Sequence, residues 1–163
     1  MATTDPQSAA LQAMQDPGGG NPWQSPIFQV ARAWAAQDPT SVANWAISMT
    51  DSNAEARTIS QVMRQWTRED MSAAVNWVNA LPQGASYDAA AAALAFSMVP
   101  NNPQDAVGWA DNIADASARA DALQRVSREV MWRDPTNGAA ILEAAGVPAN
   151  LIPPPGQRGS CGR

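Results

Sequence analysis

Three arginines recur at a regular interval and could bind carboxylates. Arg64 follows Arg32 by one interval, Arg128 follows Arg64 by two, and Phe96 occupies the position between them. On a helical wheel, these positions lie nearly opposite the apolar side of their predicted helices. A guanidinium group donates paired hydrogen bonds to a carboxylate, so such a ladder would suit an acidic or C-terminal peptide. The alternative is an ordinary solvated helix face in a chain that contains no lysine.

Two asparagines occupy a second polar position of the same interval. Asn44 and Asn76 are followed at this position by Gly108 and Ala140 in later copies. If the helices that carry these residues line the concave side of a stack, the two amides could hydrogen-bond the backbone of a bound segment. The alternative is that small side chains here serve only to permit tight curvature.

The chain lacks the residues of several common catalytic and metal sites. Its 163 residues include no histidine and one cysteine, which excludes a Ser-His-Asp triad, a structural zinc site and an internal disulfide. No G-x-x-x-x-G-K-S/T loop is present to bind a nucleotide. Carboxylate pairs such as Glu69 with Asp70 are more simply explained as helix caps or surface charges. We therefore expect no catalytic residues, no bound metal, no cofactor and no enzymatic activity.

The charge and the N-terminal sequence restrict partners and location. A net charge of −5 disfavours a general phosphate-binding surface, so nucleic acid is not an expected partner. The segment 1–20 contains neither the basic nor the apolar region of a signal peptide. No window approaches the roughly 18 uninterrupted apolar residues of a membrane span. A cytoplasmic protein is the default expectation, although a fragment of a longer exported chain would look the same.

These polar positions belong to a sequence that repeats with a period of about 32 residues, and such a period is typical of stacked structural repeats. Three columns of residues recur over four copies, which is hard to obtain by chance. The columns are Trp34, Trp66, Met98 and Val130; Trp45, Trp77, Trp109 and Ile141; and Asp38, Asp70, Asn102 and Asp134.

Each copy contains two apolar stripes that predict two helices. Apolar residues recur at i, i+3, i+4 and i+7, which places them on one side of an α-helix. Asp38-Pro39 separates the stripes of the first copy, because aspartate accepts hydrogen bonds from the start of a helix and proline is tolerated in its first turn. No stretch alternates with period two, so strands are not expected. The stripes run over 27–34, 42–49, 59–66, 74–81, 91–98, 106–113, 123–130 and 138–145.

The pattern resembles the helical-hairpin repeats called tetratricopeptide-like, and more closely a bacterial variety written W-x3-D-P-x2-A-x2-W. Residues 34–45 and 66–77 carry the resemblance, which covers about residues 25–147. The chain departs from the tetratricopeptide consensus, because that repeat has a period of about 34 residues. It also lacks the Trp-x2-Leu-Gly-x2-Tyr signature. The resemblance implies a role as a binding scaffold.

We therefore expect an all-α fold, a right-handed α-solenoid of about four αα-hairpin repeats with eight to nine helices. Residues 25–147 would form this repeat domain. Residues 1–24 would be an N-terminal segment that carries either a capping helix or a flexible tail, and residues 148–163 would be a disordered tail rich in proline and glycine. Trp132 is expected near a helix end, partly exposed. The structural residues, expected to be buried ribs of the core, are Trp34, Trp45, Trp66, Trp77 and Trp109.

The leading functional hypothesis is a protein- or peptide-binding scaffold or adaptor. Its partner would be a protein or peptide segment, an acidic one being a candidate. An alternative is a carrier or precursor whose C-terminal tail is modified around Cys161. A third hypothesis is a structural spacer within a larger assembly. The predicted partner-binding residues are Arg32, Arg64, Arg128, Asn44 and Asn76.

Overall fold

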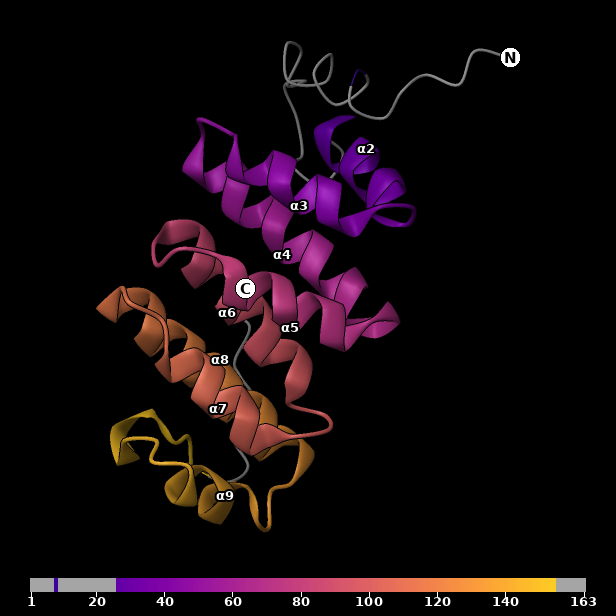
Figure 1. Cartoon of the computed structure of the whole chain (residues 1–163). Coiled ribbons are helices and arrows are strands. Elements are labelled where there is room, and N and C mark those ends of the chain that lie inside the picture. The colour runs from indigo at the N-terminus through magenta and orange to yellow at the C-terminus, as the bar shows by residue number, and fades with distance from the viewer. Residues whose placement is uncertain (1–7, 9–25, 155–163) are drawn as a thin grey trace, which may run out of the picture. The chain divides into compact units, whose positions relative to one another are not determined.

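Residues 26–154 form eight α-helices and no strand in the computed structural model (Figure 1), which describes these residues together with Ser8. The eight helices fall on the eight predicted stripes, so the all-α class is confirmed. The proposed N-terminal capping helix, apart from Ser8, and the segment around Cys161 lie outside the described residues. The helices are α2 (Pro26–Ala35), α3 (Pro39–Ile47), α4 (Ser52–Glu69), α5 (Met71–Ala80), α6 (Ala85–Met98), α7 (Pro103–Asp111), α8 (Ala116–Arg133) and α9 (Gly138–Ala144).

The polar column of the repeat caps the starts of helices. Asp38 Oδ1 accepts a hydrogen bond from the backbone N–H of Ser41 at 3.0 Å, and Asn102 Oδ1 accepts one from Asp105 at 3.2 Å. Each bond satisfies an N–H group that has no partner within its helix. The break between the two helices of a repeat is therefore fixed by local chemistry. Asp70 makes the same type of bond to Ala73 in the first turn of α5, whereas Asp134 accepts a hydrogen bond from Asn137, the residue just before α9.

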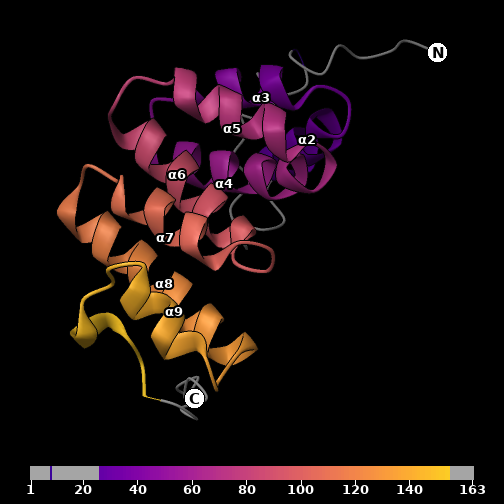
Figure 2. The ribbon, with the colours of Figure 1, turned by 60° about the horizontal axis from the view of Figure 1, so that its bottom comes forward.

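The chain divides into two compact units after Trp77. In the first unit, α2, α3 and α4 contact one another (Figure 2). Their apolar stripes meet in a core that includes the fully buried side chains of Val42, Ile59, Val62 and Met63. This burial stabilises the helices, which would be marginal in isolation at their length.

Two tryptophan pairs in the first unit have the same geometry. The rings of Trp34 and Trp45 lie 5.9 Å apart at 49°, and those of Trp66 and Trp77 lie 5.9 Å apart at 47°. Trp34 and Trp66 are buried, each with 5% of its surface exposed. Trp45 and Trp77 are only half-buried, as is Trp109 in the second unit. The expectation that these three would be buried is therefore met only in part.

The half-burial of Trp77 has a direct physical reason. Its indole Nε1–H donates a hydrogen bond of 3.0 Å to Oδ1 of Asn44, an exposed residue of α3 in the preceding repeat. A tryptophan places its N–H where a partner or water can accept it, so one edge of the ring stays at the surface. In the third copy Gly108 occupies the position of Asn44, and in the fourth copy Ile141 occupies the position of Trp77. This pair of positions therefore has neither the acceptor nor the donor of the bond.

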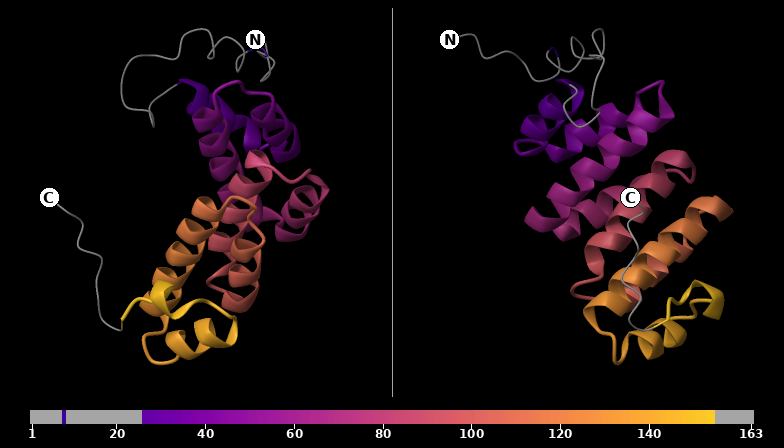
Figure 3. Two further views of the ribbon diagram at one scale, coloured as in Figure 1. Left: turned by 90° about the vertical axis from the view of Figure 1, so that its left-hand side faces the viewer. Right: turned by 180° about the vertical axis from the view of Figure 1, so that it is seen from behind.

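In the second unit, α6, α7 and α8 contact one another, and α9 packs on α7 and α8 (Figure 3). Asp88 of α6 is a buried carboxylate with 8% of its surface exposed. Its two oxygens accept hydrogen bonds from the backbone N–H groups of Ala114 and Asp115, at 2.9 and 3.1 Å. This side chain therefore holds the loop between α7 and α8 against α6.

The start of the predicted C-terminal tail is ordered. Gly146 ends α9 with a φ of +84°, and the next N–H, of Val147, reaches back to the carbonyl of Leu142 at 3.0 Å. The chain then forms the 3₁₀ turn η2 (Ala149–Leu151), which contacts α8. The prediction of disorder from residue 148 onward is wrong here, because Leu151 and Ile152 are half-buried apolar side chains.

The Asn44–Trp77 bond can be measured with a double-mutant cycle of Asn44→Ala and Trp77→Phe. We expect a coupling energy of about 0.5–1.5 kcal/mol in urea denaturation followed by circular dichroism. Asn79→Ala, on the exposed surface of α5, is the control for the gain in helix propensity that any Asn→Ala change brings. A coupling energy near zero would show that the bond contributes nothing in solution.

Two hydrogen-bonded aspartates, Asp38 and Asp134, predict a loss of stability in acid. The hydroxyl and N–H groups of Ser41 hold the pKa of Asp38 below its ordinary value, and the N–H and amide of Asn137 do the same for the pKa of Asp134. A lowered folded-state pKa contributes stability above the unfolded pKa of about 3.9, and that stability is lost as pH falls through the folded value.

We therefore expect the Asp38→Asn/Asp134→Asn variant to be less stable than the wild type at neutral pH. This difference in unfolding free energy should shrink as the pH falls below about 4, because the wild-type carboxylates become protonated. Urea denaturation at a series of pH values measures it. A difference that stays constant into acid would contradict the assignment.

Candidate functional site

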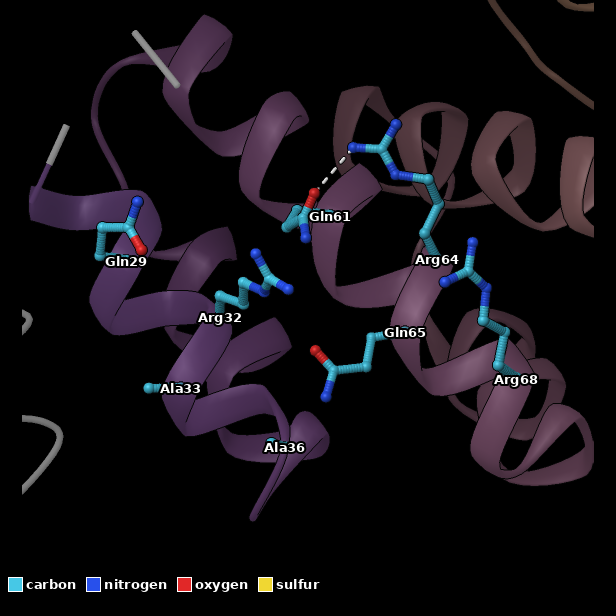
Figure 4. Close-up of a pocket in the computed structure, with 8 residues that line it drawn as sticks. All are labelled: Gln29, Arg32, Ala33, Ala36, Gln61, Arg64, Gln65 and Arg68. Carbon is cyan, nitrogen blue, oxygen red and sulfur yellow. Dashed lines mark hydrogen bonds between the residues drawn. The ribbon is translucent and has the colours of Figure 1, made fainter. Parts of the chain in front are cut away.

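An open groove of about 730 Å³ lies between α2 and α4 of the first unit (Figure 4). Its lining contains guanidinium groups, primary amides and alanine methyl groups, and no carboxylate. Donors of hydrogen bonds therefore outnumber acceptors along the groove. The lining residues are Gln29, Arg32, Ala33, Ala36, Gln61, Arg64, Gln65 and Arg68.

The two sides of the groove come from the same four repeat positions in two successive repeats. Its residues on α2 and directly after it follow the spacing i, i+3, i+4 and i+7, which marks one side of a helix. Its four lining residues on α4 stand at the same positions of the next repeat. The groove thus lies between equivalent faces of the first helices of two successive repeats.

Long polar side chains from both helices enter the groove. Arg32 from α2 and Gln65 from α4 extend into the space between the two helices (Figure 4). Arg64 is half-buried, and its Nη2 donates a hydrogen bond of 2.9 Å to Oε1 of Gln61. This bond fixes the direction of one guanidinium group, whereas Arg32 and Arg68 are exposed.

The positive charge of the groove is not neutralised within the described part of the chain. Across residues 26–154, the one ion pair joins Arg133 to Glu129, so Arg32, Arg64 and Arg68 have no carboxylate partner there. Glu69 accepts a hydrogen bond from Nε2 of Gln65 at 3.1 Å, at the end of α4. Three guanidinium groups are consequently available to an anionic ligand.

The groove contains two of the three arginines that the sequence singled out. Arg32 and Arg64 line it, whereas Arg128 lies exposed on α8 in the second unit and is not part of the lining. Arg68 was missed, although it stands one helical turn after Arg64 and so shares its face. Gln29 and Gln61 were also missed, although they are separated by the same 32-residue interval as Arg32 and Arg64.

The predicted asparagine positions do not belong to this groove. Asn44 and Asn76 are exposed, and the amide oxygen of Asn44 already accepts the Trp77 bond. The equivalent position on α7 is Gly108, where an added Cβ would meet no atom within 4 Å. It belongs to a depression of about 220 Å³, lined by Gln104, Asp105, Gly108, Trp109 and Asn112.

Neither a metal-binding cluster nor a membrane-spanning helix is formed by the described residues. Ser8 and residues 26–154 contain no group of three or more cysteine or acidic side chains placed to hold a metal ion. Among the helices of this part of the chain, none combines the length and apolarity needed to cross a bilayer. Comparisons with protein-family models, with curated proteins and with solved structures find no match. The resemblance to tetratricopeptide-like repeats thus depends on the sequence motif.

Proposed function

We propose that this protein is a scaffold without enzymatic activity that binds an acidic segment of a protein or peptide between α2 and α4. The observation that carries the proposal is the set of three guanidinium groups, Arg32, Arg64 and Arg68, on one groove without a carboxylate partner among the described residues. Charge-assisted hydrogen bonds to carboxylates are about twice as strong as neutral ones. An acidic segment is therefore the class of ligand that gains the most binding free energy from these three arginines.

The length of the groove suggests the length of the segment. Its lining spans seven residue steps on each side, for example from Gln29 of α2 to Ala36, the residue after α2, which corresponds to about 10 Å. An extended chain advances about 3.3 Å per residue, so roughly three ligand residues lie within the groove. The glutamine amides can donate to and accept from the backbone of such a segment.

We further propose that residues 25–147 continue as one right-handed α-solenoid of about four repeats. The support comes from the sequence, because the tryptophan and aspartate columns keep their interval on both sides of Trp77. Repeats of this kind bury their apolar faces on their neighbours, which is what a repeated apolar stripe requires.

The binding proposal can be tested with a fluorescein-labelled peptide that carries three consecutive glutamates between Gly-Ser flanks. We expect the full chain to bind this probe in fluorescence anisotropy. Arg32→Glu/Arg64→Glu/Arg68→Glu should weaken binding at least about tenfold, because each lost charge-assisted contact is worth about 1.5–3 kcal/mol. Binding should also weaken as salt is raised.

The control reverses an exposed arginine that does not line the groove, in the variant Arg57→Glu. This variant should bind the triglutamate probe as the wild type does, and circular dichroism should show unchanged helicity for both variants. Equal binding by the groove variant and the wild type, or no binding by the wild type, would refute the proposal.

A further inference from the structure

A second surface of the chain combines arginines with an exposed tryptophan. Arg125, Arg128 and Trp132 lie on α8 at the spacing i, i+3 and i+7, so they share one side of the helix. They occupy the repeat positions that Gln29, Arg32 and Ala36 occupy in the first repeat. We call Arg125, Arg128 and Trp132 the α8 face. It belongs to the second unit and shares no residue with the groove.

Trp132 is the exposed aromatic of this face. Its side chain is 72% exposed, and it is the one exposed large apolar side chain among the described residues. Arg133 places its Cζ 5.9 Å from the centroid of the indole ring. Arg133 is itself held by Glu129, whose Oε1 lies 2.7 Å from the arginine Nε. The tryptophan therefore stands beside an anchored cation, and much of its surface is left for another molecule to cover.

The arginines of the α8 face differ in their surroundings. Arg125 extends over Phe96 of α6, with its Cζ 5.5 Å from the ring centroid. Arg128 is exposed and has no ion-pair partner among the described residues. Asp121 stands one turn before Arg125 and makes that end of the face acidic. A ligand carboxylate is thus favoured at Arg128, between Arg125 and Trp132.

We propose that the α8 face is a second docking site, for a partner segment that presents a carboxylate and a large apolar side chain two residues apart. The carboxylate pairs with Arg128, and the apolar side chain covers Trp132. Arg128 and Trp132 are four positions apart on the helix, a rise of about 6 Å. Two steps along an extended peptide span about 6.6 Å, so both contacts can form together.

The charge of the protein favours a short segment over an extended polyanion. Fifteen acidic residues against ten basic ones give the chain a net charge of −5. A membrane surface or a nucleic acid would face this negative charge over a wide area, whereas a short segment meets only the α8 face. Covering an exposed indole also releases water from apolar surface, which a phosphate backbone cannot do.

The test compares two fluorescein-labelled peptides with Gly-Ser flanks, one containing Asp-Gly-Phe and one containing Asp-Gly-Gly. We expect the full chain to bind the Asp-Gly-Phe probe at least about tenfold more tightly, a difference of about 1.4 kcal/mol. Trp132→Ala should remove this preference, whereas Arg128→Glu should weaken the binding of both probes, because both carry the aspartate. Trp132→Phe should keep most of the preference, because it retains an aromatic ring.

The groove variant Arg32→Glu/Arg64→Glu/Arg68→Glu should bind the Asp-Gly-Phe probe normally, so failure of the groove proposal and failure of this one are distinguishable. Circular dichroism checks that Trp132→Ala keeps its helicity, as expected for an exposed residue. The proposal is overturned by equal binding of the two probes, by undiminished binding in Trp132→Ala, or by Trp132-dependent binding to anionic phosphatidylserine vesicles in place of the peptide.

Discussion

The packing of the first helix of a hairpin against the second is the interaction on which the rest of this structure depends. In the first unit, two tryptophan pairs, Trp34 with Trp45 and Trp66 with Trp77, repeat one geometry almost unchanged. The first member of each pair is buried and the second is half-buried. In the last copy Val130 is buried and Ile141 half-buried, so the same division of exposure holds with smaller residues.

Burial of the first-helix residue decides what the opposite face of that helix presents. Arg32 precedes Trp34 by two positions, which is about 200° around an α-helix. When the tryptophan enters the core, the arginine must point away from it. The same argument applies to Arg64 beside Trp66 and to Arg128 beside Val130. The arginine-bearing surfaces of both units are thus a geometric consequence of how their cores pack.

Equivalent faces have nevertheless acquired different chemistry. Between α2 and α4 the face is a groove of arginines and glutamines, whereas on α8 it carries an exposed tryptophan between cations. A repeat can diverge in this way because exposed positions contribute little to stability, and a change there leaves the core intact. The two proposed ligands accordingly share a carboxylate and differ in their apolar content.

The sequence by itself determined the order of the helices and the all-α class, although α4 and α8 extend beyond the stripes 59–66 and 123–130. Apolar spacing and the caps at Asp38 and Asn102 act within a few residues, so periodicity is enough to predict them. The 32-residue interval between Arg32 and Arg64 also showed that the two arginines occupy equivalent repeat positions. Arg68 could also have been predicted, because it lies one helical turn after Arg64 on the same face of the helix.

Tertiary structure alone decided which side chains of separate elements meet. It joined the amide of Asn44 to the indole of Trp77, left Arg128 outside the groove, and laid the 3₁₀ turn after Pro148 against α8. Each outcome depends on distances between atoms far apart in the chain. A repeat interval states which positions are equivalent, but not which partner each of them finds in space.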